Sequence, residues 1–446
     1  MSRSSAAGSS AIYHVQPIRG PLDAVVQVPG SKSIANRALV CATLADGMSV
    51  LRNVPGGDDT AAMLDCVALL GAGVAPDPHD PSIVSVYGTS GELHPGPRLL
   101  SCQLAGTTSR FVTALCALGV GHYEIDGLPP LRARPMQPLH DALASIGAEL
   151  EPGEQWGHLP VTVRGIDRGG AARGGPSSGP TTVSIRGDIS SQYITALMLI
   201  APYLAGGLHI SLTTPLISKP YVVITAAVMD SFGVHGVAID DSSVTVPPGF
   251  YRAHDYAIEP DASSASYPLA AAAICGGRVQ VADLGPNALQ GDAAFADLLG
   301  SMGCAVTRDT TGTSVSRGAD LHGIDIDMAD LSDLVPTLAA VAPFASTATT
   351  ITGVGFIRAK ESDRLGDLAT ELRAIGADIS VTADGLRIEP AGPLHGADLG
   401  THHDHRLAMA FGVLGAAVDG IGVADPDVVS KSWPGYWTVR EAVVHP

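Results

Sequence analysis

The chain has 446 residues and a formal net charge of −18 at pH 7, which argues against nucleic acid or an anionic membrane as a partner. Hydrophobic residues make up 46% of the chain and aromatic residues only 4%, so the interior must consist of Ala, Val, Leu and Ile. That composition is typical of an α/β protein, and the length predicts about two to three domains. Six cysteines stand singly in apolar contexts, which indicates buried thiols in a reducing cytoplasm and neither disulfides nor a zinc site.

The sequence shows neither a signal peptide nor a membrane-spanning segment. Residues 1–11 are rich in Ser and Ala and lack an apolar core, so we expect a flexible tail and not a signal peptide. No segment of the sequence approaches the length of a membrane span, and we expect a cytoplasmic protein. Residues 165–180, which are rich in Gly, Pro and Ser, predict a flexible surface loop.

Residues 29–37 (PGSKSIANR) lie where a strand ends and a helix begins. Strand-like sequence precedes them over residues 12–28, and apolar residues at helical spacing follow. A helix N-terminus presents unpaired N–H groups and a partial positive charge, both of which suit an anion. Lys32, Ser33 and Arg37 add two cations and a hydroxyl group at this point. We therefore expect an anion site here.

Lysine is scarce in this chain. Only four of the 26 Lys and Arg residues are lysines: Lys32, Lys219, Lys360 and Lys431. A lysine kept in such a chain is expected where a compact ammonium group is needed and a guanidinium group would not serve. The alternative is chance survival on a solvated surface, where most lysines lie.

A pattern of an apolar helical segment, a glycine and a small residue recurs along the chain. The glycines lie between 70 and 86 residues apart, at Gly71, Gly147, Gly233, Gly303 and Gly376. Each is predicted to follow the last residue of a helix, where a positive φ is required. Five copies predict a repeated compact α/β unit and not a thin solenoid. The C-terminal segment would be a sixth unit, although its sequence shows no clear copy of the pattern.

Several further segments place polar groups at predicted helix starts. They are residues 104–110 (LAGTTSR), residues 132–135 (RARP), residues 190–192 (SSQ) and residues 218–221 (SKPY). Backbone N–H groups, guanidinium groups and hydroxyl groups in these positions suit phosphates and polyols. Each segment taken alone is equally well explained as a helix cap.

Two segments in the C-terminal half carry acid–base groups. Residues 360–364 (KESDR) concentrate cations and carboxylates, as proton transfer near an anion requires, although alone they would suggest a solvated charged segment. Asp333 is a lone carboxylate before an apolar helix and is either an N-cap or a base. Residues 403–406 (HDHR) contain histidines without a second ligand cluster, so we expect no metal.

Nucleotide chemistry finds no support in the sequence. No Gly-x-x-x-x-Gly-Lys motif is present, which excludes a P-loop, and no Rossmann fingerprint is convincing. We expect no cofactor. Several separate anion sites with one acid–base cluster indicate a transferase that acts on two small phosphorylated or carboxylated substrates.

Together these motifs resemble the 5-enolpyruvylshikimate-3-phosphate (EPSP) synthase family, in the family's order and from about residue 15 onward. Residues 261–267 (DASSASY), residues 290–292 (QGD), residues 404–406 and Lys431 are similar to family motifs as well. The resemblance implies an inside-out α/β barrel of two lobes, each built from three βαβαββ units. Residues 30–259 would form the N-terminal lobe, and residues 12–29 with residues 260–446 the C-terminal lobe. It also implies a monomer without a nucleic-acid or membrane partner.

The family's reaction moves the enolpyruvyl group of phosphoenolpyruvate to the 5-hydroxyl of shikimate 3-phosphate and releases phosphate. The resemblance assigns shikimate 3-phosphate to Lys32, Ser33, Arg37, Ser190, Ser191, Gln192, Ser218, Tyr221, Asp333 and Lys360. It assigns phosphoenolpyruvate to Lys32, Gly106, Arg134, Gln192, Arg364, Arg406 and Lys431. The implied catalytic residues are Asp333, which takes the hydroxyl proton, Glu361, which handles a proton at the methylene carbon, and Lys32, which contacts both substrates.

Some features leave alternatives open. Leu104 stands where the family commonly has Asn, and Phe356 where it has a polar residue, so affinity or the response to glyphosate beside Gly106 could differ. An enzyme similar to UDP-N-acetylglucosamine enolpyruvyl transferase would carry a reactive cysteine in a mobile loop, and residues 128–136 contain none. A secondary pathway with a modified cyclic acceptor stays possible, whereas the charge of −18 counts against an RNA-end enzyme of the related cyclase fold.

Overall fold

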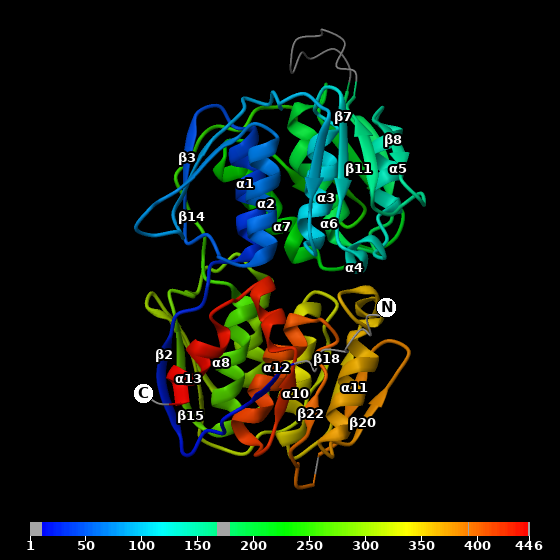
Figure 1. Cartoon of the computed structure of the whole chain (residues 1–446). Coiled ribbons are helices and arrows are strands. Elements are labelled where there is room, and N and C mark those ends of the chain that lie inside the picture. Colours follow the sequence, from blue (N-terminus) through cyan, green and yellow to red (C-terminus); the bar gives the residue numbers. More distant parts are fainter. Residues whose placement is uncertain (1–10, 167–178, 391, 445–446) are drawn as a thin grey trace, which may run out of the picture.

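The computed structural model describes residues 11–166, 179–390 and 392–444. Residues 1–10 of the predicted tail and residues 167–178 of the predicted loop lie outside the described residues. Within the described part, sheets lie on the outside of the molecule and helices on the inside (Figure 1). Nearly every residue of α1, α8 and α12 is buried, as an inside-out barrel requires.

The upper half in Figure 1 contains three sheets. The first unit consists of α1 (Lys32–Leu44), β3 (Met48–Arg52), α2 (Asp58–Leu69), β4 (Gly73–Pro76), β5 (Val84–Tyr87) and β14 (Tyr256–Ala257). The second consists of β6 (Arg98–Ser101), α3 (Gly106–Cys116), β7 (His122–Asp126), α4 (Pro129–Arg132), α5 (Gln137–Ser145), β8 (Glu149–Pro152) and β9 (Val161–Arg164). The third consists of β10 (Thr181–Ile185), α6 (Ser191–Ile200), the 3-10 helix η1 (Ala201–Tyr203), β11 (Leu208–Leu212), α7 (Lys219–Ser231), β12 (Ala238–Ile239) and β13 (Ser243–Val246).

The lower half contains the other three sheets. The fourth unit consists of β2 (Leu22–Val26), α8 (Ala262–Cys275), β15 (Gly277–Ala282), η2 (Gly291–Ala294), α9 (Phe295–Ser301), β16 (Ala305–Asp309) and β17 (Gly312–Arg317). The fifth consists of β18 (Asp325–Asp327), η3 (Ser332–Leu334), α10 (Val335–Val341), η4 (Ala342–Phe344), β19 (Thr349–Thr352), η5 (Gly355–Ala359), α11 (Arg364–Ala374), β20 (Ile379–Val381) and β21 (Leu386–Ile388). The sixth consists of β22 (Asp398–Leu399), α12 (His405–Ala417), β23 (Gly422–Ala424), η6 (Pro426–Lys431), α13 (Tyr436–Val444) and β1 (Ile12–His14).

Each four-stranded sheet has the same strand arrangement, a parallel pair completed by two antiparallel strands, as in the order β10-β11-β13-β12. A helix joins the two parallel strands directly in three of these sheets, whereas the parallel pairs β14–β3 and β2–β15 bring together strands that are far apart in the sequence. This is the predicted βαβαββ unit, and the predicted inside-out α/β barrel is confirmed. The sixth unit is a three-stranded sheet in which β1, from the start of the chain, takes the last place beside β23. In the other units a hairpin follows the second helix and completes the sheet, whereas in the sixth unit β1 alone takes that place among the described residues. This difference explains why the sequence shows no clear sixth copy.

The five repeated glycines end α2, α5, α7, α9 and α11. Their φ angles lie between +88° and +113°, the left-handed region that favours glycine. In every copy the next residue donates its N–H to the carbonyl five positions earlier, as Ala72 does to Val67 at 3.1 Å. This is the Schellman motif, which satisfies the last carbonyls of a helix. The prediction for these glycines is confirmed.

The chain passes twice between the two halves, and the two passages pair with each other. Gly30 bridges Pro260, and the Ser31 N–H donates to the Glu259 carbonyl at 2.9 Å. A Cβ atom on Gly30 would lie 1.7 Å from the Asn53 carbonyl oxygen, so only glycine fits this crossing. The passages exchange strands, because β2 pairs with β15 and β14 pairs with β3.

Buried apolar residues form two separate cores. One core draws on residues 34–258, and the other on residues 15–28 together with residues 262–436. We infer from these cores that the chain divides into an N-terminal lobe of residues 30–259 and a C-terminal lobe of residues 12–29 and 260–446. No helix among the described residues has the length and apolar character needed to cross a membrane.

Candidate active site

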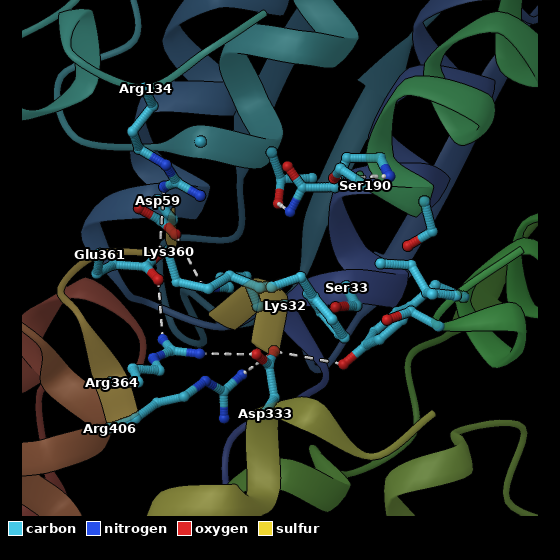
Figure 2. A pocket seen from close by; sticks show the side chains of 18 of the residues that line it. Lys32, Ser33, Asp59, Arg134, Ser190, Asp333, Lys360, Glu361, Arg364 and Arg406 are labelled. Carbon is cyan, nitrogen blue, oxygen red and sulfur yellow. Dashed lines mark hydrogen bonds and ion pairs between the residues drawn. The ribbon is translucent and has the colours of Figure 1, made fainter. Parts of the chain in front are cut away.

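A pocket lies between the lobes and is lined by both (Figure 2). Its lining residues are Lys32, Ser33, Arg37, Asp59, Gly106, Thr107, Arg134, Ile189, Ser190, Ser191, Gln192, Ile217, Ser218, Tyr221, Asp333, Phe356, Lys360, Glu361, Arg364, His405 and Arg406. Six of these side chains are cationic and three are carboxylates, in a chain whose net charge is −18. An acidic protein thus places six of its 26 Lys and Arg side chains in one pocket, which suits anionic ligands.

The pocket collects the N-termini of helices from both lobes. Residues at or next to the first turn of α1, α3, α6, α7, α11 and α12 line it. Ser190 caps α6 by accepting from the Gln192 N–H at 3.3 Å, and Asp404 caps α12 by accepting from the Arg406 N–H at 2.9 Å. Because unpaired N–H groups and positive dipole ends converge, the backbone adds to the attraction for anions.

Asp333 is the centre of an ion-pair cluster and caps no helix. Its carboxylate accepts from Arg364 Nη1 at 2.9 Å, from Arg406 Nη2 at 2.7 Å and from the Tyr221 hydroxyl of the other lobe at 3.4 Å. Burial opposes its ionisation, but Arg406, Lys360 and Arg364 outweigh burial and hold the pKa of Asp333 well below its ordinary value. Of the two interpretations left by the sequence, the N-cap is wrong.

Glu361 and Arg364 extend this cluster. Arg364 is buried and also donates to Glu361 at 2.8 Å and to Asp404 at 2.7 Å. Burial opposes the charge of Arg364, yet the carboxylates Asp404, Glu361 and Asp333 raise its pKa above the ordinary value. Burial would raise the pKa of Glu361, but Arg134 and Arg364 lower it well below the ordinary value. Arg134 reaches Glu361 from the N-terminal lobe at 3.3 Å.

Three of the four lysines lie at this site. Asp59 accepts from Lys32 Nζ at 2.9 Å and forms an ion pair with Lys431 Nζ at 3.2 Å. The Lys360 ammonium lies 5.8 Å from the centre of the Phe356 ring, and burial lowers the pKa of Lys360. Lys219 is the exception, because its ammonium pairs with the exposed carboxylate of Asp241 at 2.9 Å. The expectation drawn from lysine scarcity is thus wrong for Lys219.

Arg37 lines the pocket, but most of its donors serve the fold. Its guanidinium donates to Thr225 at 2.8 Å, to the Ser33 carbonyl at 2.6 Å, and to Thr195 and the Tyr221 carbonyl at 3.2 Å each. These bonds tie α1 to α6 and α7 within the N-terminal lobe. Burial lowers the pKa of Arg37 to about 10, so the group stays charged at neutral pH.

The sequence matches one family model and relatives of known name. The family model of EPSP synthase (3-phosphoshikimate 1-carboxyvinyltransferase) matches residues 17–439. A 3-phosphoshikimate 1-carboxyvinyltransferase from Nostoc punctiforme is 41% identical over 95% of this chain and 97% of its own length. One from Methanoculleus marisnigri is 40% identical over 94% of this chain and 96% of its own length. The chain belongs to the EPSP synthase family.

Solved structures share the EPSP synthase fold. The EPSP synthase from Acinetobacter baumannii matches with a TM-score of 0.80 at 22% identity, covering 97% of this chain and 98% of that one. The enolpyruvyl transferase NikO from Streptomyces tendae matches with a TM-score of 0.76 at 18% identity, covering 98% of both chains. At these identities the two structures show the fold alone. Family membership makes the chain a transferase that moves the enolpyruvyl group of phosphoenolpyruvate to shikimate 3-phosphate.

The structure brings the predicted site residues of this EPSP synthase family member together. All of them line the pocket except Lys431, which reaches it through Asp59 and donates to the Leu104 carbonyl at 2.7 Å. Phe356 is on the pocket wall, and the Leu104 side chain is on a neighbouring cavity with Arg134 and Lys431.

Sequence reasoning assigned no role to two titratable residues of the pocket, Asp59 and His405. Asp59 lies in the first turn of α2, where an acidic residue is ordinary, so the sequence carries no sign of its two ammonium partners. His405 lies in a segment that the sequence matches to a family motif, but the sequence assigns it no role other than that of a rejected metal ligand. In the part of the chain that the structure describes, neither of its ring nitrogens has a hydrogen-bond partner. Burial, with Lys32 and Arg406 nearby, holds the pKa of His405 well below its ordinary value, so the ring is neutral.

Proposed function

We propose that enolpyruvyl transfer takes place in this interlobe pocket, with the two substrates on different walls. The polar side chains of Ser190, Ser191, Gln192, Ser218 and Tyr221 form one wall, which suits the hydroxyl groups and phosphate of shikimate 3-phosphate. Lys32, Ser33, Arg37, Asp333 and Lys360 complete that site. The group that would hold phosphoenolpyruvate consists of Lys32, Gly106, Arg134, Gln192, Arg364, Arg406 and Lys431.

The observation that carries this proposal is the cluster around Asp333. Its carboxylate lies between the two guanidinium groups proposed for phosphoenolpyruvate, Arg364 and Arg406, and the wall proposed for the cyclic acceptor. A base must reach the acceptor hydroxyl, and the cations must reach the donor's phosphate and carboxylate. Here the proposed base, Asp333, is within 2.9 Å of both guanidinium groups proposed to bind the donor.

The low pKa values of Asp333 and Glu361 fit catalysis once the ligands are considered. An anionic substrate bound to Arg364, Arg406 and Arg134 would compete for the charges that now keep both carboxylates ionised. Substrate binding would thereby raise both pKa values. Asp333 then becomes a base able to take the 5-hydroxyl proton, and Glu361 becomes able to carry a proton to the methylene carbon. The cations meanwhile stabilise the charge of the tetrahedral intermediate.

The site is formed within one chain, so no second copy is needed to complete it, and we propose a monomer. The net charge of −18 supports small-molecule substrates and not nucleic acid, and we propose a cytoplasmic location. Size-exclusion chromatography with light scattering tests the oligomeric state. A dimer at working concentration would contradict this part.

The test of function is phosphate release from phosphoenolpyruvate with a panel of acceptors. We expect turnover with shikimate 3-phosphate. Turnover with another cyclic acceptor alone would point to a secondary pathway, and turnover with UDP-N-acetylglucosamine would point to the related transferase. Either result without turnover of shikimate 3-phosphate contradicts the proposal.

A further inference from the structure

The two lobes meet at a backbone contact that lies beside the pocket. Gly57, the N-cap residue of α2, has an ordinary φ of −79°, so conformation does not explain the glycine. A Cβ atom there would lie 2.8 Å from the Lys431 carbonyl oxygen and 2.9 Å from Ser432 Cα. Those neighbours are backbone atoms and cannot move aside as a side chain can. The glycine is therefore required by the approach of the other lobe.

Side chains on both sides continue this contact. Asp58 accepts from the Ser430 hydroxyl at 2.5 Å, and the next residue, Asp59, pairs with Lys431 Nζ at 3.2 Å. Residues 57–59 thus contact residues 430–432, with Gly57 against the backbone of residues 431 and 432, Asp58 against Ser430 and Asp59 against Lys431. We call this contact the interlobe clasp.

Asp59 also links the clasp to the chemistry. Its side chain is only 4% exposed and binds Lys32 Nζ at 2.9 Å with the oxygen that does not face Lys431. One buried carboxylate therefore holds one ammonium group from each lobe. Without that carboxylate the two like charges would repel each other in a poorly solvated space.

We infer that the interlobe clasp seats residues 430–432 and so delivers the Lys431 ammonium to the phosphoenolpyruvate site as the lobes meet. Asp59 is a positioning residue that aligns Lys32 and Lys431 with each other. The inference rests on the proposed substrate roles of these two lysines. It adds residues 57–59 and Ser430, which neither the sequence nor the proposed substrate contacts include.

The adjacent glycines Gly56 and Gly57 provide a matched test of the interlobe clasp. Gly57→Ala puts a methyl group against the backbone of residues 431 and 432, whereas a Cβ atom on Gly56 meets nothing within 4 Å. We expect Gly57→Ala to lower kcat/KM for phosphoenolpyruvate about 10²-fold, because a displacement of about 1 Å in a catalytic group has such an effect. Gly56→Ala should stay within about threefold of wild type, and the dissociation constant of shikimate 3-phosphate should change less than kcat/KM in both variants. Equal kcat/KM values for the two variants would refute the inference that the interlobe clasp positions Lys431.

Small-angle scattering tests the interlobe clasp without requiring turnover. We expect the substrate-free Gly57→Ala variant to have a larger radius of gyration than substrate-free Gly56→Ala. This result separates the two proposals, because an inactive wild type refutes the proposed function while the scattering still tests the clasp. Identical scattering of the two variants would count against the clasp.

A double-mutant cycle tests the role of Asp59, and it does not depend on how well Gly57→Ala folds. Asp59→Asn and Lys431→Met should each lower kcat/KM for phosphoenolpyruvate at least tenfold, and the double variant should be little worse than either. Asp59→Glu should recover part of the loss, and Asp65→Asn, an exposed carboxylate on the same helix, should behave as wild type. Additive losses, or an Asp59→Asn effect on thermal stability alone, would refute the positioning role.

Discussion

Replacing Asp333 by Asn is the most informative single change, because the side chain keeps its shape and loses its charge. The carboxylate now accepts from Arg364 at 2.9 Å and from Arg406 at 2.7 Å. Asn offers one carbonyl oxygen and turns an NH₂ group toward the other guanidinium. Arg364 keeps its bonds to Asp404 and Glu361, so the change falls mainly on Arg406.

Two separate magnitudes follow from this geometry. Loss of one partner in a buried ion pair costs about 3 kcal/mol of stability. Because the low pKa of Asp333 stabilises the fold above the ordinary carboxyl pKa, this difference is complete at pH 7 and shrinks as the pH falls below about 3.8. Loss of the base should lower kcat by about 10²–10⁴, or about 3–5 kcal/mol in the activation barrier.

The assay is phosphate release at saturating substrates, together with calorimetric binding of shikimate 3-phosphate. We expect the dissociation constant to stay within about fivefold of wild type while kcat falls. Asp325→Asn, an exposed carboxylate in β18, is the control and should leave both values unchanged. If Asp333→Asn kept kcat within about threefold of wild type, Asp333 would not be the base.

Three further predictions follow from particular side chains. Lys32→Arg should lower turnover at least about 10²-fold because a guanidinium does not fit the ammonium position beside Asp59, while Lys219→Arg on the surface should be neutral; equal activities would refute the argument from lysine chemistry. Glyphosate should compete with phosphoenolpyruvate, and Gly106→Ala should raise the inhibition constant of glyphosate more than the KM of phosphoenolpyruvate. The methyl group, 2.6 Å from Arg134 Nη1, would narrow the space beside residue 106, and phosphoenolpyruvate is smaller than glyphosate. An unchanged inhibition constant at fixed shikimate 3-phosphate would contradict this. Burial raises the pKa of Asp292 to about 7, so its contribution to stability is complete below the ordinary value of 3.8 and is lost as the pH rises to about 7. Between pH 4 and pH 8, the free energy of unfolding of Asp292→Asn, measured with urea, should therefore rise relative to that of wild type by up to about 4 kcal/mol. If the two unfolding free energies changed in parallel with pH, this prediction would be wrong.

Local features of the sequence determined the helix ends of this protein. The five repeated glycines follow their helices because a positive φ after a helix depends on a few neighbouring residues only. Ser190 and Asp404 cap their helices for the same local reason. The family motifs in chain order were also sufficient to indicate the fold and the set of residues around the pocket.

The tertiary structure decided which groups meet across long separations. Nothing near Asp59 in the sequence indicates its pairing with Lys32 and Lys431, and nothing near Lys219 indicates that it lies outside the pocket. Arg37 likewise has bonds to α6 and α7 that its own motif does not reveal. Such contacts depend on how the two lobes pack and on the pairing of strands that are distant in the sequence, such as β1 with β23 and β14 with β3. Burial and hydrogen bonding summed over the whole chain fix those pairings.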